Sequence, residues 1–151
     1  SDYIKDFVVM LYETGARYSE LAELQHSNVD LHNRKLTFVD TKNGDDRTIP
    51  INERALSILK RYRFGKTVFN IDYQKFYEHF CKARHSVELD YFHAHDLRAC
   101  WCTNAILSGM SLPEVSALSG HKSWSMLRRY TRIKPEDLEE KVNKIVWIES
   151  K

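Results

Sequence analysis

The sequence predicts an α+β fold that is mainly helical and contains a small antiparallel β-sheet. Apolar residues recur at helical spacing in most segments, whereas strand-like alternation is confined to residues 35–41 and 47–51. The length of 151 residues and the hydrophobic content of 42% suffice for one domain with its own core. We therefore expect a single domain, over residues 1–151, that carries one β-hairpin.

The first segment is predicted to be an amphipathic helix. Its apolar residues share one helical face: Ile4, Phe7, Val8 and Leu11. Gly15 is expected to end this helix, and Ser19 is the expected N-cap of a second, short helix. Arg17 is thereby placed in the bend between the two helices.

Residues 35–41 and 47–51 are predicted to form the β-hairpin. Asn43-Gly44 supplies the positive φ angles that a tight turn requires, so Lys42 is expected where the first strand enters the turn. Pro50 indicates that the second strand lies at an edge or is ending, because proline has no N–H to donate to a neighbouring strand.

The remaining segments are predicted to be helices with recognisable caps. Asn52 caps a helix that runs to about residue 63, and Asp72 opens the next helix. Further helices are predicted at about 95–108, 111–119 and 123–130, and from residue 135 onward. Gly120 ends the helix that begins at residue 111, which leaves His121 just beyond its end.

Composition narrows the class of protein but does not identify a partner. The net charge of +2 is too small to indicate nucleic-acid binding. No apolar run is long enough to span a bilayer and no signal-peptide pattern opens the chain, so we expect a soluble, intracellular protein. The cysteines lack zinc-ribbon or disulfide spacing and are expected to be reduced and mostly buried: Cys81, Cys100 and Cys102. Because a helix starts at the first residues, we expect a fragment of a longer protein.

Several polar residues are candidates for chemistry, although each has an ordinary structural interpretation. An arginine in a bend, such as Arg17, is usually solvated or paired with a nearby acid such as Glu20. His95 and Arg98 share a helix face, but such pairs are common on helix surfaces. Lys42 is explained equally well as a turn residue, His121 as a residue that closes a helix end, and Tyr130 as a packing residue.

Together, these side chains form a set suited to phosphoryl transfer. The planar guanidinium groups of Arg17 and Arg98 match the nonbridging oxygens of a phosphate. The phenol of Tyr130 is the candidate nucleophile, and its ordinary pKa of ~10 means that it needs a base and cationic neighbours. Lys42 on the turn can protonate the leaving sugar oxygen. No carboxylate cluster accompanies the set, so we expect no metal and no cofactor.

Five segments, in this order, resemble the motifs of tyrosine recombinases of the phage integrase type. Residues 14–21 (TGARYSEL) resemble the T-G-x-R-x-S-E-L box, and residues 41–44 (TKNG) the hairpin lysine. Residues 95–98 (HDLR) resemble the H-x-L-R box, residues 119–121 (SGH) the Leu/Ser-Gly-His motif, and residues 130–131 (YT) the nucleophile segment. The resemblance covers nearly the whole chain. It implies the catalytic-domain fold of that family.

The resemblance also implies a role for each site residue. Arg17 and Arg98 would hold one backbone phosphate of DNA, and His121 would donate a hydrogen bond to it. Tyr130 would be the nucleophile and Lys42 the general acid. His95 would act in proton transfer with Tyr130, and Glu20 would support the arginines and the histidine. The chain departs from the family at Ser119, where Leu is commoner, and at residues 100–102 (CWC), where small residues and Thr are often found.

Partners and location follow from the same resemblance. It implies double-stranded DNA carrying attachment or recombination sites, other recombinase protomers that complete a tetramer, and the cytoplasm of a bacterial or phage-infected cell. It also implies an additional N-terminal DNA-binding domain outside this chain. The last predicted helix has an apolar face that either packs on its own domain or docks on a neighbouring protomer: Leu138, Val142, Ile145 and Val146.

Three other functions are compatible with parts of the sequence. A type IB topoisomerase shares the tyrosine chemistry, although the motifs favour an integrase. A metal nuclease could use His93, His95 and Asp96, but an H-x-H pair rarely forms a metal site without further ligands. A non-enzymatic module could use the short helices of residues 111–130 as a helix-turn-helix.

Overall fold

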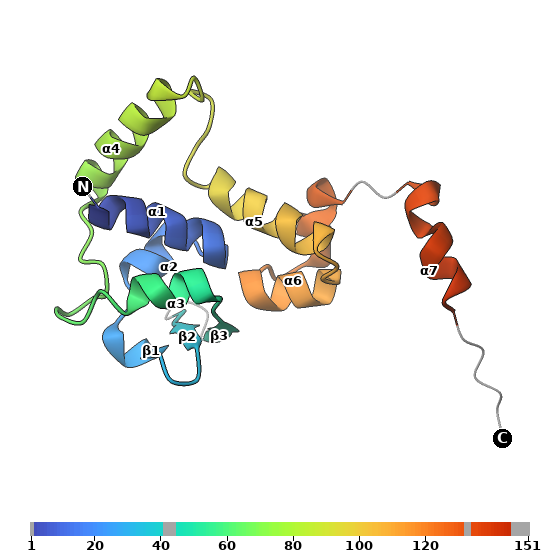
Figure 1. The fold of residues 1–151 in the computed structure, drawn as a ribbon, viewed down its shortest axis with the longest axis horizontal. Helices are drawn as coiled ribbons and strands as arrows, with labels where there is room; N and C mark the ends of the chain where they lie inside the picture. Colours follow the sequence, from blue (N-terminus) through green and yellow to red (C-terminus); the bar gives the residue numbers. More distant parts are fainter. Residues whose placement is uncertain (1, 41–44, 132–133, 146–151) are drawn as a thin grey trace.

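The computed structural model describes residues 2–40, 45–131 and 134–145 (Figure 1). Its α-helices are α1 (Asp2–Thr14), α2 (Tyr18–Ala22), α3 (Glu53–Leu59), α4 (Tyr73–Ser86), α5 (Asp96–Leu107), α6 (Leu112–Ser119) and α7 (Glu139–Asn143). Short 3-10 helices lie at η1 (His26–Asn28), η2 (Trp124–Tyr130) and η3 (Pro135–Leu138). The strands are β1 (Val29–Asp30), β2 (Lys35–Phe38) and β3 (Arg47–Pro50).

The strands form one antiparallel sheet in the order β1-β2-β3. Leu36 pairs with Ile49, and both side chains are buried because they occupy the inward positions of alternating strands. Pro50 is the last residue of the edge strand β3, as predicted. The predicted turn, with Lys42, falls in residues 41–44, outside the described residues.

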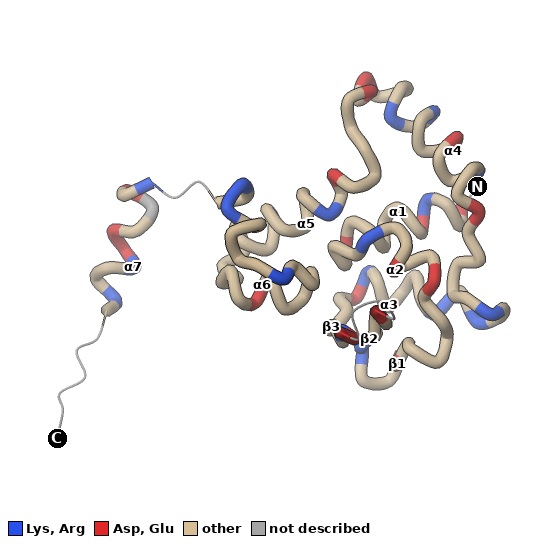
Figure 2. The backbone as a smooth tube through the Cα atoms, turned by 180° about the vertical axis from the view of Figure 1, so that it is seen from behind, with Lys and Arg blue, Asp and Glu red and all other residues tan. Residues whose placement is uncertain are grey.

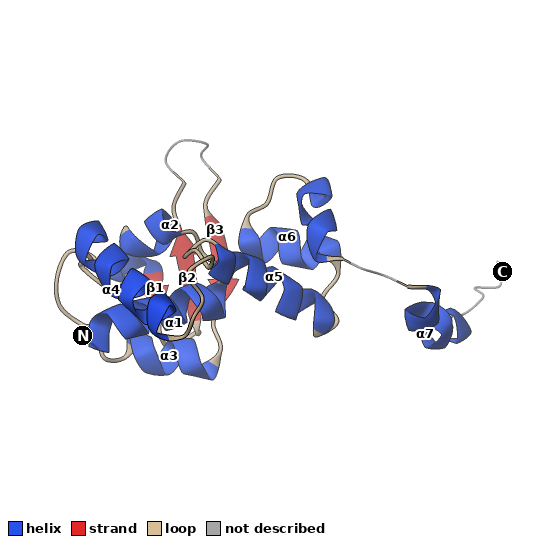
Figure 3. Cartoon of the chain, turned by 90° about the horizontal axis from the view of Figure 1, so that it is seen from above, coloured by secondary structure: helices blue, strands red, loops and turns tan. Residues whose placement is uncertain are grey.

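The buried apolar side chains form two hydrophobic clusters. Helices α5 and α6 lie side by side, next to the part of the fold that contains α1 and the sheet (Figures 1 and 3). The larger cluster joins α1 to α4 and the sheet, with Phe7 and Leu36 among its most buried members. The smaller one joins α5, α6 and η2 through Cys102, Val115 and Leu127. Helix α5 belongs to both, because Leu97 near its start lies in the larger cluster. The loops after α1 and α6 meet the start of α5, where Arg98 binds the carbonyl of Gly15 and lies beside His121.

Side-chain capping explains where α3, α4 and α6 begin. The side chains of Asn52 and Asp72 accept hydrogen bonds of 2.9 Å from the backbone N–H groups three residues later, and Ser111 and Glu114 form a capping box. The prediction of Ser19 as an N-cap is wrong, since α2 begins at Tyr18.

Two further expectations differ from the structure. The helix α3 ends at Leu59, before the predicted boundary near residue 63. The backbone N–H groups of Arg61 and Tyr62 bind carbonyls three residues earlier, and this tighter pattern ends the α-helix. Of the cysteines, Cys102 is buried, whereas Cys81 and Cys100 are only partly buried.

The helix α7 lies apart from the two clusters (Figure 1). Its apolar side chains are exposed, with fractions of 58% for Val142 and 68% for Ile145. Acidic and basic positions are interspersed along the described chain, in keeping with the small net charge (Figure 2). Within the described residues, none of the helices combines the length and the apolarity needed to cross a bilayer.

Candidate active site

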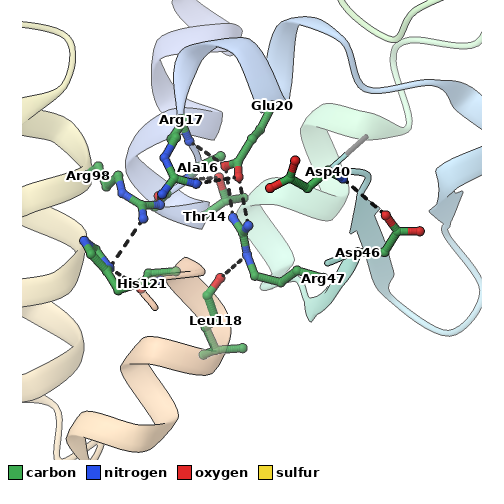
Figure 4. Close-up of polar contacts among 12 residues, drawn as sticks. Thr14, Ala16, Arg17, Glu20, Asp40, Asp46, Arg47, Arg98, Leu118 and His121 are labelled. Carbon is green, nitrogen blue, oxygen red and sulfur yellow. Dashed lines mark hydrogen bonds and ion pairs between the residues drawn. The ribbon is translucent and has the colours of Figure 1, made fainter. Parts of the chain in front are cut away.

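The loop after α1 presents Arg17 beside a carboxylate that it shares with a second arginine. Glu20 accepts a hydrogen bond of 2.8 Å from the backbone N–H of Arg17 and lies 3.0 Å from its guanidinium group. Arg47 of β3 binds both oxygens of the same carboxylate, at 2.8 and 3.0 Å (Figure 4). The Arg17 side chain remains 44% exposed, so its guanidinium group is accessible to a ligand. Glu20 thus pairs with two arginines and holds them in place.

The buried Arg98 reaches the same place from α5. It is 3% exposed and donates a hydrogen bond of 2.7 Å to the backbone carbonyl of Gly15. Gly15 has a φ of +66°, and a Cβ there would lie 2.6 Å from the Trp101 ring. Glycine is therefore required both to end α1 and to let α5 approach this loop.

His121 joins Arg98 from the end of α6. A second nitrogen of the Arg98 guanidinium group lies 3.4 Å from Nδ1 of His121. Gly120 ends α6 with a φ of +77°, and a Cβ there would lie 2.6 Å from the guanidinium group of Arg47. This left-handed turn directs His121 back toward α5.

Burial and positive charge set the protonation states in this cluster. Burial lowers the pKa of Arg98 to about 10, and the charge of Arg17 acts in the same direction. Burial, followed by the charges of Arg98 and Arg17, lowers the pKa of His121 to about 4. At neutral pH, Arg98 is therefore charged and His121 is neutral.

The pKa of Glu20 shifts against the effect of its burial. Burial raises the pKa of this carboxyl, but the hydrogen bonds and charges of Arg47 and Arg17 outweigh it, and the pKa lies below its ordinary value. Glu20 is thus ionised at neutral pH and keeps both arginines paired.

Two other predicted residues, His95 and Tyr130, have no direct contact with the cluster among the described residues. His95 is the exposed N-cap residue of α5, and its electrostatic effect contributes to the lowered pKa of His121. Tyr130 ends η2 and is partly buried against the smaller hydrophobic cluster, with the Arg129 guanidinium carbon 5.9 Å from its ring centroid. The structure therefore brings together Arg17, Glu20, Arg98 and His121, but no contact links the Tyr130 phenol to them within the described residues.

The sequence prediction missed Arg47. Besides Glu20, it binds the backbone carbonyl of Leu118 at 2.7 Å through Nε, and so joins the sheet to the end of α6 (Figure 4). The available signal was its position. Arg47 lies two residues before the buried Ile49 on the same strand, so the two side chains share the inward face. A charged residue at an inward strand position needs a partner.

Replacing Arg47 by Gln is expected to lower the free energy of unfolding by about 2–4 kcal/mol, because Glu20 loses its bidentate partner in a partly buried position. The measurement is chemical denaturation of both proteins. The matched control is Arg54→Gln, since Arg54 pairs with Glu13 but is 69% exposed, and its loss is expected to change stability by only ~0–1 kcal/mol. Equal effects of the two substitutions would contradict the assignment.

A cleft of about 350 Å³ opens beside the cluster. Its lining includes Arg17, Arg47, Gly120, Asp46 and Lys122. Asp46 accepts a hydrogen bond of 3.2 Å from the backbone of Asp40, which holds the base of the hairpin together at this cleft. Across the described ranges, no group of three or more His, Cys, Asp or Glu side chains is placed to hold a metal ion.

Comparison with known proteins identifies the family of this chain. Residues 2–137 match the model of the phage integrase family. The shufflon-specific DNA recombinase of Escherichia coli is 29% identical over 153 residues, which cover 95% of this chain and 40% of the recombinase. Tyrosine recombinase XerA of Pyrococcus furiosus is 30% identical, with coverage of 99% of this chain and 57% of XerA.

The chain therefore spans only part of the length of both relatives. Among solved structures, the catalytic domain of bacteriophage HP1 integrase aligns with a TM-score of 0.74 and 27% identity, over 92% of this chain and 80% of that domain. The predicted mainly helical fold with a small antiparallel sheet is confirmed by this likeness. The chain belongs to the phage integrase family of tyrosine recombinases.

Proposed function

We propose that this chain is the catalytic domain of a site-specific DNA recombinase that cuts and rejoins DNA through a 3′-phosphotyrosyl link to Tyr130. The observation that carries the proposal is the convergence of Arg17, Arg98 and His121, from three separate elements, on one small region. Such a group of fixed donors is suited to the negative charge that develops on a phosphate during its transfer.

The proposed reaction assigns to these residues the roles that the family resemblance implies. Arg17 and Arg98 hold the nonbridging oxygens of one DNA phosphate, and His121 donates a hydrogen bond to the same group. The Tyr130 oxygen attacks phosphorus, the bond from phosphorus to the 5′ oxygen breaks, and Lys42 gives its proton to that leaving oxygen. His95 accepts the phenol proton. Attack by a 5′-hydroxyl from another strand reverses these steps, so exchange consumes neither ATP nor a metal.

The phenol has to leave its packing position for this attack. Its ring is partly buried against the cluster of Val115 and Leu127, and η2 carries it as its last residue. Turning the side chain toward the phosphate, on binding of DNA, would complete the site. The partners in this proposal are double-stranded DNA and other protomers of the recombinase, in the cytoplasm of a bacterial or phage-infected cell.

A trapping experiment tests the proposal. Nicked duplexes that carry the attachment site lose the short strand end after cleavage and so cannot be rejoined. A covalent adduct is therefore expected to accumulate on a denaturing gel, with Tyr130 identified by peptide mapping. EDTA is expected to leave the yield unchanged, because the reaction uses no metal. A metal nuclease would lose activity in EDTA, and a non-enzymatic helix-turn-helix module would form no adduct.

A second experiment distinguishes recombination from simple relaxation. Two intact duplexes that each carry the attachment site are expected to exchange strands and yield products containing strands of both duplexes. A type IB topoisomerase would relax supercoiled DNA instead and give little exchange between duplexes.

A further inference from the structure

Ser119, the last residue of α6, contacts the imidazole of His121. Its side chain is fully buried, at 0% exposure, and Oγ lies 2.5 Å from Nδ1 of His121. The backbone N–H of His121 points at the same oxygen, at 3.4 Å. Because an amide N–H only donates, Oγ accepts from it and its own proton is available to Nδ1.

The contact with Arg98 also indicates that Nδ1 of His121 accepts a hydrogen bond. A guanidinium nitrogen of Arg98 lies 3.4 Å from Nδ1, and a charged guanidinium group has donors but no acceptor. If Nδ1 carried a proton, its N–H would point at an N–H of Arg98, and neither group could accept a hydrogen bond. Nδ1 is therefore the acceptor, which leaves the ring proton of a neutral imidazole on Nε2.

We propose that Ser119 is a positioning residue that holds His121 as the neutral tautomer with its proton on Nε2, the form that can donate to a phosphate oxygen. The part that concerns the phosphate rests on the proposed function. The tautomer itself depends only on the contacts of the folded chain.

Burial and the neighbouring basic residues keep this ring neutral, as the mechanism requires. Burial is the largest cause of the lowered pKa of His121, which is about 4. The residues whose electrostatic effects lower it further come from several elements: Arg98, Arg17, His95 and Arg129. Without the Ser119 hydroxyl, the neutral ring would keep a single weak donor contact, from Arg98, to select its tautomer.

A second serine fixes the backbone of the same residue. Ser116, three residues before Ser119 on α6, donates a hydrogen bond of 2.5 Å to the carbonyl of His121. The two serines therefore act on different parts of His121, because Ser116 holds the main chain and Ser119 orients the ring. The leucine that is commoner at position 119 in the family would fill space but would offer no donor.

The tautomer can be measured on the free chain. Long-range proton–nitrogen NMR correlation on ¹⁵N-labelled protein at neutral pH is expected to show a pyridine-like Nδ1 and a pyrrole-like Nε2 for His121. The chain has seven histidines, so the spectrum of His121→Gln identifies the signals. A proton on Nδ1, or a charged ring, would overturn the proposal without any need for a variant at Ser119.

Two matched serine variants separate orientation of the ring from packing. Ser119→Ala is expected to mix the two tautomers of His121 and to slow adduct formation on nicked DNA by about tenfold. Ser116→Ala removes a buried hydroxyl from the same helix and is expected to keep the proton on Nε2. An unchanged tautomer in Ser119→Ala, or equal mixing in both variants, would exclude the role of Ser119. If no adduct forms but the tautomers behave as expected, the proposed function fails and the positioning role stands.

Discussion

Replacing Tyr130 by Phe is expected to abolish covalent capture of DNA while leaving DNA binding largely intact. The substitution removes only the hydroxyl oxygen, which is the attacking atom in the proposed reaction. The ring packs with Leu127 and Val115, and Phe can keep this packing, so the fold is expected to persist. The measurement is the yield of adduct on a denaturing gel, with binding followed separately by gel shift.

A second tyrosine provides the control for this experiment. Tyr91 is 73% exposed and lies outside the cluster of site residues, so Tyr91→Phe is expected to form the adduct as the unmodified chain does. An adduct that persists in Tyr130→Phe would refute the nucleophile assignment. Loss of binding together with the adduct would point to a structural role for the phenol.

Replacing Arg98 by Lys is expected to slow cleavage by about 10²–10³-fold, the usual effect of removing one fixed donor to a developing negative charge. Arg98 donates to the Gly15 carbonyl and also lies 3.4 Å from His121. A lysine retains the positive charge but has no planar fork, so it cannot reproduce both contacts and hold a phosphate. The measurement is the single-turnover rate of adduct formation.

Loss of fold has to be separated from loss of chemistry in this variant. Arg98 is 3% exposed, and burial of a lysine at that position also reduces stability. The rate is therefore compared at a temperature where circular dichroism shows both proteins fully folded. The control is Arg54→Lys, at a side chain that is 69% exposed, for which we expect the normal rate. Cleavage by Arg98→Lys at that same rate would remove Arg98 from the site.

Much of the fold was predictable from the sequence because its signals are local. Asn52, Asp72 and Ser111 cap helices through hydrogen bonds to residues three positions later, so each signal lies within one helical turn. The hairpin strands were recognisable from their alternation, and Pro50 correctly indicated the edge. Ser19 was mistaken for the N-cap of α2. The N-cap residue is Arg17, and the Glu20 side chain accepts a hydrogen bond from its backbone N–H.

Short, continuous motifs were enough to identify the candidates for chemistry and their order along the chain. The folded chain was needed to reveal that Glu20 is shared with Arg47, 27 residues away, and that Arg47 also binds Leu118, 71 residues away. The same holds for Ser119, whose hydroxyl is recognisable as a partner of the His121 ring only once Gly120 turns the chain back. Ion pairs and buried hydrogen bonds depend on distances in space, and a linear pattern does not contain those distances.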